Sequence, residues 1–364
     1  MPVSRTPRRK KLAGATTKAR SKGPRDEVRR VYRAHMTGLA ERMLGVEATS
    51  FSFPGGSRRD SCRMTLADNR SVIATVREEP MRADLEERVL LALAPHGAPA
   101  PRVLASNRRV LVQEDVGEQR LSVALHEAGR RGDGGAVTEL MRTALGSLHA
   151  LQSAGHAAGL SERVPLLGVD DGWIEALIDR PRALGQLLGV IVPRADVSTL
   201  RDLLSVLDPR FVKWDARPAN AAVNAAGEVS WIDFEHCGAR NPLDDVAWLI
   251  ADEYVPLDPR RDIVLMGEWG DRFGGSLPPA LLPHYLWTMA MLHGTHRLNL
   301  MVNSRLNREE WRDSEKLVAR DSVGASMEFA ERQCDRLAHF ARQSSLVADF
   351  APFYETCRYA LTKL

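Results

Sequence analysis

The sequence predicts an α+β protein with two lobes: a small N-terminal lobe built on an antiparallel sheet with helices, and a larger, mainly helical C-terminal lobe. Segments rich in β-branched residues and turn formers are concentrated before residue 117, whereas long amphipathic helical patterns follow it. A chain of 364 residues, 44% of them hydrophobic, also exceeds what one compact core usually holds. We therefore expect lobes at 26–116 and 117–364, preceded by a separate tail.

The tail, residues 1–25, contains nine Lys and Arg residues and no acidic residue, which leaves a formal charge of −6 on residues 26–364. It has few bulky apolar side chains, so burial cannot offset the entropy lost on ordering, and we expect disorder. Short basic segments can bind nucleic-acid phosphates, but such motifs give many false positives. We expect a solubilising extension or a misplaced start codon rather than a nucleic-acid partner.

The N-terminal lobe is expected to begin with a helix over 26–44, which an aspartate can cap. The segments 60–66 and 71–77 flank the turn sequence Ala-Asp-Asn-Arg and predict a β-hairpin. A helical pattern over 83–94 is followed by glycine and proline residues, which end helices, and then by a strand over 108–116. This order places most of the predicted strands in the first third of the chain.

The C-terminal lobe opens with an apolar stripe at helical spacing over 136–152. A short β-rich region over 210–234 interrupts the helical pattern. Helices are expected again over 242–252, 279–301 and 308–342.

The β-rich region contains Asp215, Asn220 and Asp233. Residues 221–224 and 229–232 flank Ala-Ala-Gly-Glu and predict an antiparallel hairpin. If its turn centres on the Ala-Gly pair, positions 220 and 233 face each other, with Cβ atoms about 4.5–5.5 Å apart. An amide oxygen and a carboxylate are hard ligands that suit Mg²⁺, which takes further oxygens from water and nucleotide phosphates.

Asp215 precedes Asn220 by five positions, so a loop shaped by Pro218 has to connect them. A carboxylate in this loop can accept the proton of a substrate hydroxyl that attacks a γ-phosphate. Taken singly, such residues are ordinary members of turns and helix caps. Their combination at consistent spacing favours phosphoryl transfer.

The motif D-x-x-x-x-N at 215–220 is followed by I-D-F-E at 232–235 and by N-P-L-D-D-V-A at 241–247. This series resembles the aminoglycoside phosphotransferase and choline kinase family, and the resemblance extends over about residues 45–255. It implies a protein-kinase-like fold and an enzyme that uses Mg²⁺ with ATP or GTP as phosphoryl donor.

The resemblance also implies a role for individual residues. Asp215 corresponds to the catalytic aspartate, and Asn220 and Asp233 correspond to the metal ligands. Asp245 corresponds to an aspartate that opens a helix and braces the catalytic loop. Lys213 stands where the family usually has a histidine, which mainly packs and orients that loop.

Three further matches concern the nucleotide. Gly55, Gly56 and Ser57 resemble the turn that covers the phosphates, where glycines let backbone N–H groups approach them. Glu114 and Val116 match the hinge between the lobes, where backbone groups would hold the base.

Glu86 matches the family's glutamate that pairs with a phosphate-binding lysine on the preceding strand. That strand, 71–77, contains no lysine, and the alignment puts Thr75 or Arg77 at its position. Arg77 can reach the phosphates with its longer fork, although Arg and Lys are not equivalent at such a site. The alternative is an exposed arginine at the end of a strand.

We therefore expect a kinase that phosphorylates a hydroxyl of a small molecule, with an antibiotic or a metabolite as acceptor. The alternative is a pseudokinase, a nucleotide-binding or interaction module without transfer, because the lysine is missing. Four acidic residues, Asp170, Asp171, Asp252 and Glu253, are expected on the solvated surface rather than in a pocket for a polycation. The scattered cysteines indicate neither disulfides nor zinc, and no segment predicts a membrane span, so we expect a cytoplasmic protein.

Overall fold

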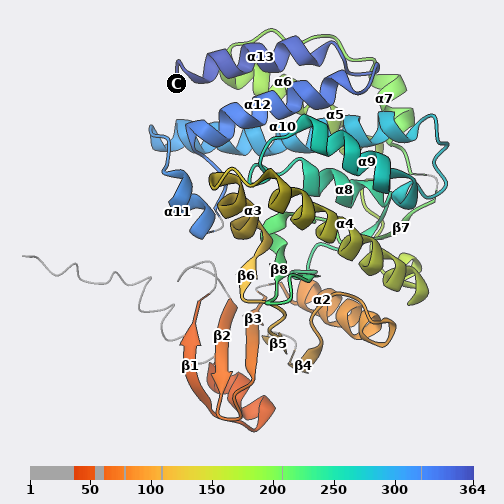
Figure 1. Cartoon of the computed structure of the whole chain (residues 1–364). Helices are drawn as coiled ribbons and strands as arrows, with labels where there is room; N and C mark the ends of the chain where they lie inside the picture. Colours follow the sequence, from red (N-terminus) through yellow and green to blue (C-terminus); the bar gives the residue numbers. More distant parts are fainter. Residues whose placement is uncertain (1–36, 54–60, 78, 108–109, 207, 321) are drawn as a thin grey trace, which may run out of the picture.

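The chain forms a sheet lobe and a larger helical lobe, which the computed structural model in Figure 1 shows one below the other. The structure describes residues 37–364 apart from 54–60, 78, 108–109, 207 and 321. Residues 37–44 are helical, as expected. The tail, the rest of the helix predicted over 26–44, and the predicted phosphate turn with Gly55, Gly56 and Ser57 lie outside the described residues.

The smaller lobe contains a five-stranded antiparallel sheet with the strand order β1-β2-β3-β5-β4. The predicted hairpin is confirmed as β2 and β3, where Cys62 lies opposite Ala74 and Met64 opposite Val72. All four side chains are buried, because alternate residues of a strand point to the same face. The bounds are β1 Ala48–Ser52, β2 Ser61–Leu66, β3 Ser71–Val76, β4 Val103–Ser106 and β5 Val110–Glu114.

Helix α2 (Pro80–Leu93) packs against β4 and β5 and also reaches the helical lobe through α4. It begins three residues earlier than the pattern predicted, because Pro80 occupies the first helical turn, where its missing N–H is not needed. The short 3₁₀ turn η1 (Ala94–His96) is followed by Gly97, whose φ of +64° suits glycine.

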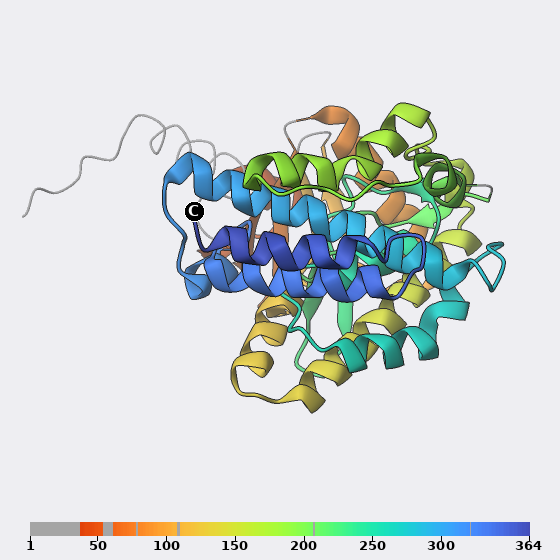
Figure 2. The ribbon, with the colours of Figure 1, turned by 90° about the horizontal axis from the view of Figure 1, so that it is seen from above.

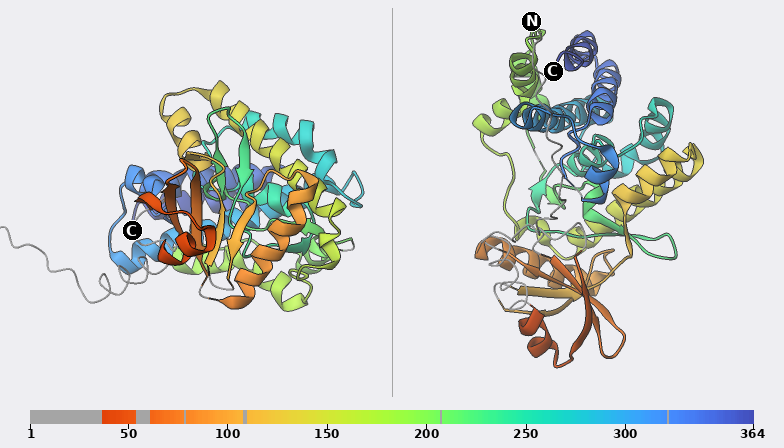
Figure 3. Two further views of the ribbon diagram at one scale, coloured as in Figure 1. Left: turned by 90° about the horizontal axis from the view of Figure 1, so that it is seen from below. Right: turned by 90° about the vertical axis from the view of Figure 1, so that its left-hand side faces the viewer.

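Helix α10 (Leu282–Arg308) runs through the middle of the helical lobe and packs against α6, α8 and α12. Seen from above, α13 lies beside α12, and Figure 3 shows this C-terminal pair at the end farthest from the sheet (Figures 2 and 3). The other long elements are α3 Leu121–Arg130, α4 Gly134–Ala157, α5 Asp171–Ile178, α6 Arg180–Leu188, α7 Val197–Leu204, α8 Leu243–Ile250, α9 Pro259–Phe273 and α13 Phe350–Leu361.

The single helix predicted over 308–342 is wrong. The structure has α11 (Ser314–Ala319) and α12 (Met327–Arg342) instead. Helix α10 ends at Arg308, and the next residue, Glu309, adopts a left-handed φ of +60°. The side chains of Asp313 and Ser326 then cap the two following helices, so local capping overrides the continuous charged pattern.

Short strands connect the lobes at the centre of the molecule. Strand β6 (Gln119–Arg120) pairs with β8 (Ala221–Val223), which pairs with β9 (Val229–Trp231). Strand β7 (Arg210–Val212) pairs with β10 (Gly238–Arg240). These strands hold both ends of the loop that carries Asp215.

A close approach of α4 to β7 supports this central region. A Cβ atom at Gly155 would lie 2.2 Å from the ring of Phe211, so the helix can reach the strand only with glycine at this position. Phe211 is buried and leads directly into the Asp215 loop. The packing of α4 therefore positions that loop.

All four cysteines are buried. Cys62 lies in β2, Cys237 follows Phe234 beside the central strands, and Cys334 and Cys357 lie in α12 and α13. Burial raises the pKa of Cys237 and of Cys357 to about 12. Among the helices that the structure describes, none is both long enough and apolar enough to span a membrane.

Candidate active site

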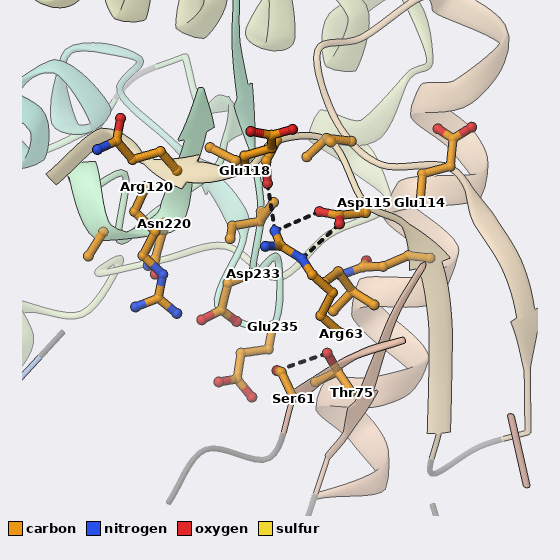
Figure 4. Close-up of a pocket in the computed structure, with 18 of the residues that line it drawn as sticks. Ser61, Arg63, Thr75, Glu114, Asp115, Glu118, Arg120, Asn220, Asp233 and Glu235 are labelled. Atoms are coloured by element: carbon orange, nitrogen blue, oxygen red, sulfur yellow. Dashed lines mark hydrogen bonds and ion pairs between the residues drawn. The ribbon is translucent and has the colours of Figure 1, made fainter. Parts of the chain in front are cut away.

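A cleft lies between the sheet and the central strands, and Figure 4 shows the side chains that face it. Three strands of the smaller lobe form one wall, the segment 113–120 closes one end, and the hairpin β8–β9 forms the opposite wall. The predicted site residues that line the cleft are Arg77, Glu114, Val116, Asn220 and Asp233.

Asp245 holds the loop before Asp215 in place. One carboxylate oxygen accepts a hydrogen bond from the backbone N–H of Lys213 and the other from that of Trp214, both at 2.8 Å. Gln152 donates a further bond to Asp245 at 2.8 Å. Burial raises the pKa of Asp245 to about 6, although these bonds favour its charged form.

The loop itself has an unusual backbone. Trp214 and Asp215 adopt left-handed φ angles of +52° and +48°, which are rare for residues other than glycine. Such conformations persist only where the surroundings impose them, and here the two bonds to Asp245 do so. As a result, the Asp215 side chain turns back toward Asn220.

Asp215 and Asn220 are in direct contact. The side-chain amide of Asn220 donates to the backbone oxygen of Asp215 at 3.0 Å and to its Oδ2 at 2.8 Å. The 3₁₀ turn η3 (Pro218–Asn220) closes the loop between them, as the position of the proline predicted. The amide oxygen of Asn220 takes no part in these two bonds.

The predicted register of the hairpin is wrong by one residue. Ala221 pairs with Trp231 and Val223 with Val229, so that position 220 lies opposite 232 and not 233. The reason is a three-residue turn that ends at Gly227, whose φ is +80°, in place of a turn centred on the Ala-Gly pair.

Asp233 nevertheless faces the same cleft as Asn220, because its own φ of +66° bends the chain at the end of β9 (Figure 4). Its backbone oxygen accepts a bond from the buried Nζ of Lys213 at 3.0 Å. Burial opposes ionisation of Asp233, but the positive charges of Arg77 and Lys213 outweigh it and lower its pKa. Asp233 is therefore ionised at neutral pH.

Arg77 forms ion pairs with three carboxylates. Its guanidinium lies 2.7 Å from Oε2 of Glu86, 2.7 Å from Oδ1 of Asp233 and 3.3 Å from Oε1 of Glu235. Glu86 is only 1% exposed, and its other oxygen accepts the backbone N–H of Phe234 at 3.1 Å.

Of the two residues that the alignment offers for the position of the lysine, Arg77 is the one that contacts Glu86. Arg77 pairs with Glu86, and its side chain is only 14% exposed, so the alternative of an exposed arginine is wrong. Thr75 is buried, and its hydroxyl lies 3.0 Å from that of Ser61.

One residue that contacts the predicted hinge, Arg63, could not be identified from the sequence. Arg63 lies 2.7 Å from Oδ2 of Asp115 and donates to the backbone oxygen of Gly117 at 2.7 Å. A Cβ atom at Gly117 would lie 2.8 Å from the backbone oxygen of Val223, so glycine is needed where the hinge meets the hairpin. Only the structure places Arg63, on β2, next to a hinge 52 residues later.

The expectation that the four acidic residues lie on the solvated surface is wrong for two of them. Asp252 and Glu253 are buried and form ion pairs with Arg217 and Arg297, both at 2.8 Å or less. Asp170 caps α5 and accepts from the backbone N–H of Trp173. The buried pair is neutralised within the protein, so it offers no charge to a polycation.

The cleft suits a divalent metal by the chemistry of its donors. The carboxylate of Asp233, with 34% of its side chain exposed, and the side chains of Asn220 and Glu235 all line it. Carboxylate and amide oxygens are the ligands that Mg²⁺ prefers. Over the described part of the chain, no group of three or more His, Cys, Asp or Glu side chains is arranged to hold a metal, so ligands of this site have to include the asparagine or non-protein oxygens.

The fold and the cleft define a two-lobed phosphotransferase. A family model described as "Phosphotransferase enzyme family" matches residues 52–282, and the chain belongs to this family. The match covers the cleft, the hinge and the Asp215 loop. A search of curated proteins found no significant match.

Several solved structures resemble the chain at low identity. Choline kinase LicA from Streptococcus pneumoniae is 13% identical, with 86% of this chain and 99% of that chain covered and a TM-score of 0.48. Macrolide 2'-phosphotransferase MphH from Brachybacterium faecium is 14% identical, with 79% and 97% covered and a TM-score of 0.47. Amicoumacin kinase hAmiN, in complex with AMP-PNP and Ca²⁺, is 13% identical, with 85% and 95% covered and a TM-score of 0.49.

Proposed function

We propose that this chain is a small-molecule kinase that transfers the γ-phosphate of ATP or GTP to an alcohol, with Mg²⁺ as cofactor. The observation that carries the proposal is the fixation of the Asp215 loop by Asp245, which sets Asp215 against Asn220 at the edge of the cleft that Asp233 lines. Family membership gives the reaction class.

In this proposal, Asp215 is the catalytic residue that orients the acceptor hydroxyl and takes its proton. Asp215 is half-buried, and its Oδ2 accepts a hydrogen bond from the side-chain amide of Asn220. This bond fixes the orientation of the carboxylate. Positioning of this kind supplies most of the catalysis in phosphoryl transfer, where the protein does little covalent chemistry.

Asn220 and Asp233 would hold Mg²⁺, which supplies charge neutralisation at the nucleotide phosphates when bound. Arg77 would contact the phosphates while Glu86 keeps its guanidinium in place. The backbone of Glu114 and Val116 would bind the base, and Gly55, Gly56 and Ser57 would cover the phosphates. We take the hinge at 114–117 as the boundary between lobes at 26–116 and 117–364.

The second candidate, a pseudokinase, is favoured by one observation. Arg77, which the alignment offers for the position of the lysine, is bonded to the carboxylate of Asp233 itself. If this ion pair persisted in the presence of nucleotide, Arg77 would compete with the metal for the carboxylate of Asp233, and transfer would be impaired.

A turnover experiment separates the two candidates. We would measure ADP formation with Mg²⁺-ATP and a panel of hydroxyl compounds for the wild type and for Asp215→Asn, which keeps the size of the side chain. Acceptor-dependent turnover that Asp215→Asn lowers by at least about 1,000-fold, with unchanged nucleotide binding, supports the kinase. Nucleotide binding without transfer to any compound supports the pseudokinase. We also propose a cytoplasmic location, because the buried cysteines Cys237, Cys334 and Cys357 form no disulfide among the described residues, which favours a reducing compartment.

A further inference from the structure

A group of aromatic rings lies next to Asp215 on the side of the helical lobe. Trp214 packs against Trp173 at 5.9 Å, Trp248 at 5.8 Å and His293 at 5.5 Å between ring centroids. Trp248 and His293 are themselves 4.3 Å apart. The rings come from α5, α8, α10 and the Asp215 loop, and the three indoles are half-buried, so the group reaches the surface.

Arg180, the first residue of α6, lies beside this group. Its backbone oxygen accepts the side-chain amide of Asn299 on α10, at 3.1 Å. Its charge is close enough to contribute to lowering the pKa of both His293 and His296, after the larger effect of their burial. We call Arg180, Trp248, His293 and Asn299 the Arg180 cluster.

The Arg180 cluster contains an unusual number of polar atoms without a partner. Nε of Arg180, Nε1 of Trp248, Nε2 of His293 and Oδ1 of Asn299 are all buried, and none has a hydrogen-bond partner in the part of the chain that the structure describes. Buried polar groups are normally bonded, and each exception needs an explanation. His293 is only 4% exposed, so its unused nitrogen is held inside the protein.

The charges around the cluster are unbalanced. Nearby carboxylates already have cationic partners: Asp244 pairs with Arg240, Asp252 with Arg217 and Glu253 with Arg297. Arg180 has no carboxylate partner among the described residues, and burial alone lowers its pKa. A half-buried guanidinium without a counter-ion is costly unless a ligand completes it.

We propose that the Arg180 cluster binds an anionic group of the acceptor, a carboxylate or a phosphate, while the hydroxyl of the same molecule lies at Asp215. The guanidinium offers a fork that matches these anions. His296, whose pKa is lowered to about 4, is neutral at pH 7 and adds no second charge. The inference rests on the proposed kinase activity and specifies its substrate class: the acceptor is an anionic alcohol rather than a polycation or a choline-like cation.

Binding measurements test this directly. We would use two sets of alcohols that share a skeleton and differ in one substituent, which is anionic, neutral or cationic. The first set is glycerate, glycerol 3-phosphate, glycerol and 3-amino-1,2-propanediol, and the aromatic set is 4-(hydroxymethyl)benzoate, 1,4-benzenedimethanol and 4-(aminomethyl)benzyl alcohol. Affinities are measured on the full chain by titration calorimetry with Mg²⁺-AMP-PNP present. Tryptophan fluorescence reports occupancy, because Trp248 belongs to the cluster and packs against Trp214, next to Asp215.

The variant Arg180→Gln is compared with Arg182→Gln. Arg182 lies on the same helix, but its side chain is 61% exposed and pairs with Asp179. We expect the anionic members to bind at least tenfold more tightly than the neutral and cationic ones. Arg180→Gln should weaken their binding 10- to 100-fold, as expected for the loss of a hydrogen bond to a charged group. Arg180→Lys should recover part of the loss, and Arg182→Gln should change nothing.

Each outcome is decisive. Preference for the carboxylate or for the phosphate member identifies which anion the cluster takes. Equal binding by all charges, preference for the amines, no binding at all, or an unchanged affinity in Arg180→Gln overturns the inference. Phosphoryl transfer to the hydroxyl of an amino alcohol, in preference to the anionic compounds, would support the kinase proposal and refute the anion site. Arg180-dependent anion binding without any transfer would do the reverse.

Discussion

Nη2 of Arg77 lies 2.7 Å from Oδ1 of Asp233, so a residue at the end of β3 is ion-paired with the aspartate at the end of β9. The same guanidinium bonds Glu86, which is 1% exposed. The contact therefore joins the sheet lobe, α2 and the central strands at one point.

We predict that Arg77→Ala lowers the free energy of unfolding by about 3–5 kcal/mol, because removal of one partner leaves a buried carboxylate uncompensated. Arg77→Lys keeps a positive charge, so its free energy of unfolding should fall by less than that of Arg77→Ala. Urea denaturation measures both. Arg70→Ala serves as control, since Arg70 forms a surface pair with Asp68, and it should behave as the wild type. An Arg77→Ala protein as stable as the control would contradict the prediction.

Asp233→Asn should reduce the Mg²⁺-dependent part of nucleotide affinity at least tenfold, because the amide carries no charge for the metal. Titration calorimetry with ADP, in Mg²⁺ and in EDTA, separates this part from contacts of the base. Asp68→Asn, on an exposed turn, is the control. If Asp233→Asn retained the full Mg²⁺ effect, Asp233 would not be a metal ligand.

Asp245 predicts a defined pH dependence of stability. Its pKa in the folded state is about 6, above the value of 3.8 for an exposed aspartate. Between these two pH values, Asp245 is therefore protonated in the folded protein and ionised in the unfolded chain. The contribution of Asp245 to the free energy of unfolding is fully present below about pH 4 and is lost as the pH rises through 6. The total is about 3 kcal/mol, since one pKa unit corresponds to about 1.4 kcal/mol.

Asp245→Asn cannot titrate and isolates this effect. The unfolding free energy of the wild type minus that of Asp245→Asn should fall between pH 4 and pH 6.5 and stay constant above pH 7. Guanidinium denaturation over this range measures the difference. A difference that rises with pH would mean that the bonds from Lys213 and Trp214 lower the pKa more than burial raises it.

Gly155→Ala should destabilise the protein by about 1–3 kcal/mol, because a methyl group there collides with the ring of Phe211 and the helix or the strand has to move. Gly134→Ala is a matched control at the start of the same helix, where a Cβ atom meets nothing within 4 Å. The control should be neutral or slightly stabilising, since alanine favours helix. Thermal unfolding of the two variants compares them, and equal melting temperatures would refute the role of this contact.

The sequence predicts best those elements that are determined by residues close together in the chain. The hairpin β2–β3 and helix α8 were predicted because turn residues and apolar alternation act within a few residues. The placement of Asn220 and Asp233 in one cleft was predicted as well, although the register was wrong. One glycine with a positive φ changes a turn by one residue, and the sequence alone does not reveal its φ.

Contacts between distant segments could not be predicted. Strands β1 and β4 are short and have weak patterns, and only the neighbouring strands specify them. The ion pairs of Arg63 with Asp115 and of Asp252 with Arg217 join segments 52 and 35 residues apart. Charged residues in a sequence are most often at the surface, so burial in such pairs becomes visible only when the chain is folded.

The four buried thiols give this protein a built-in set of labelling reporters. One lies in the sheet, one beside the cleft and two in the C-terminal helices, and each can react with a thiol reagent only when its own region opens. The order in which they become alkylated would therefore show whether the sheet, the cleft or the C-terminal helices open first, with no engineered probe.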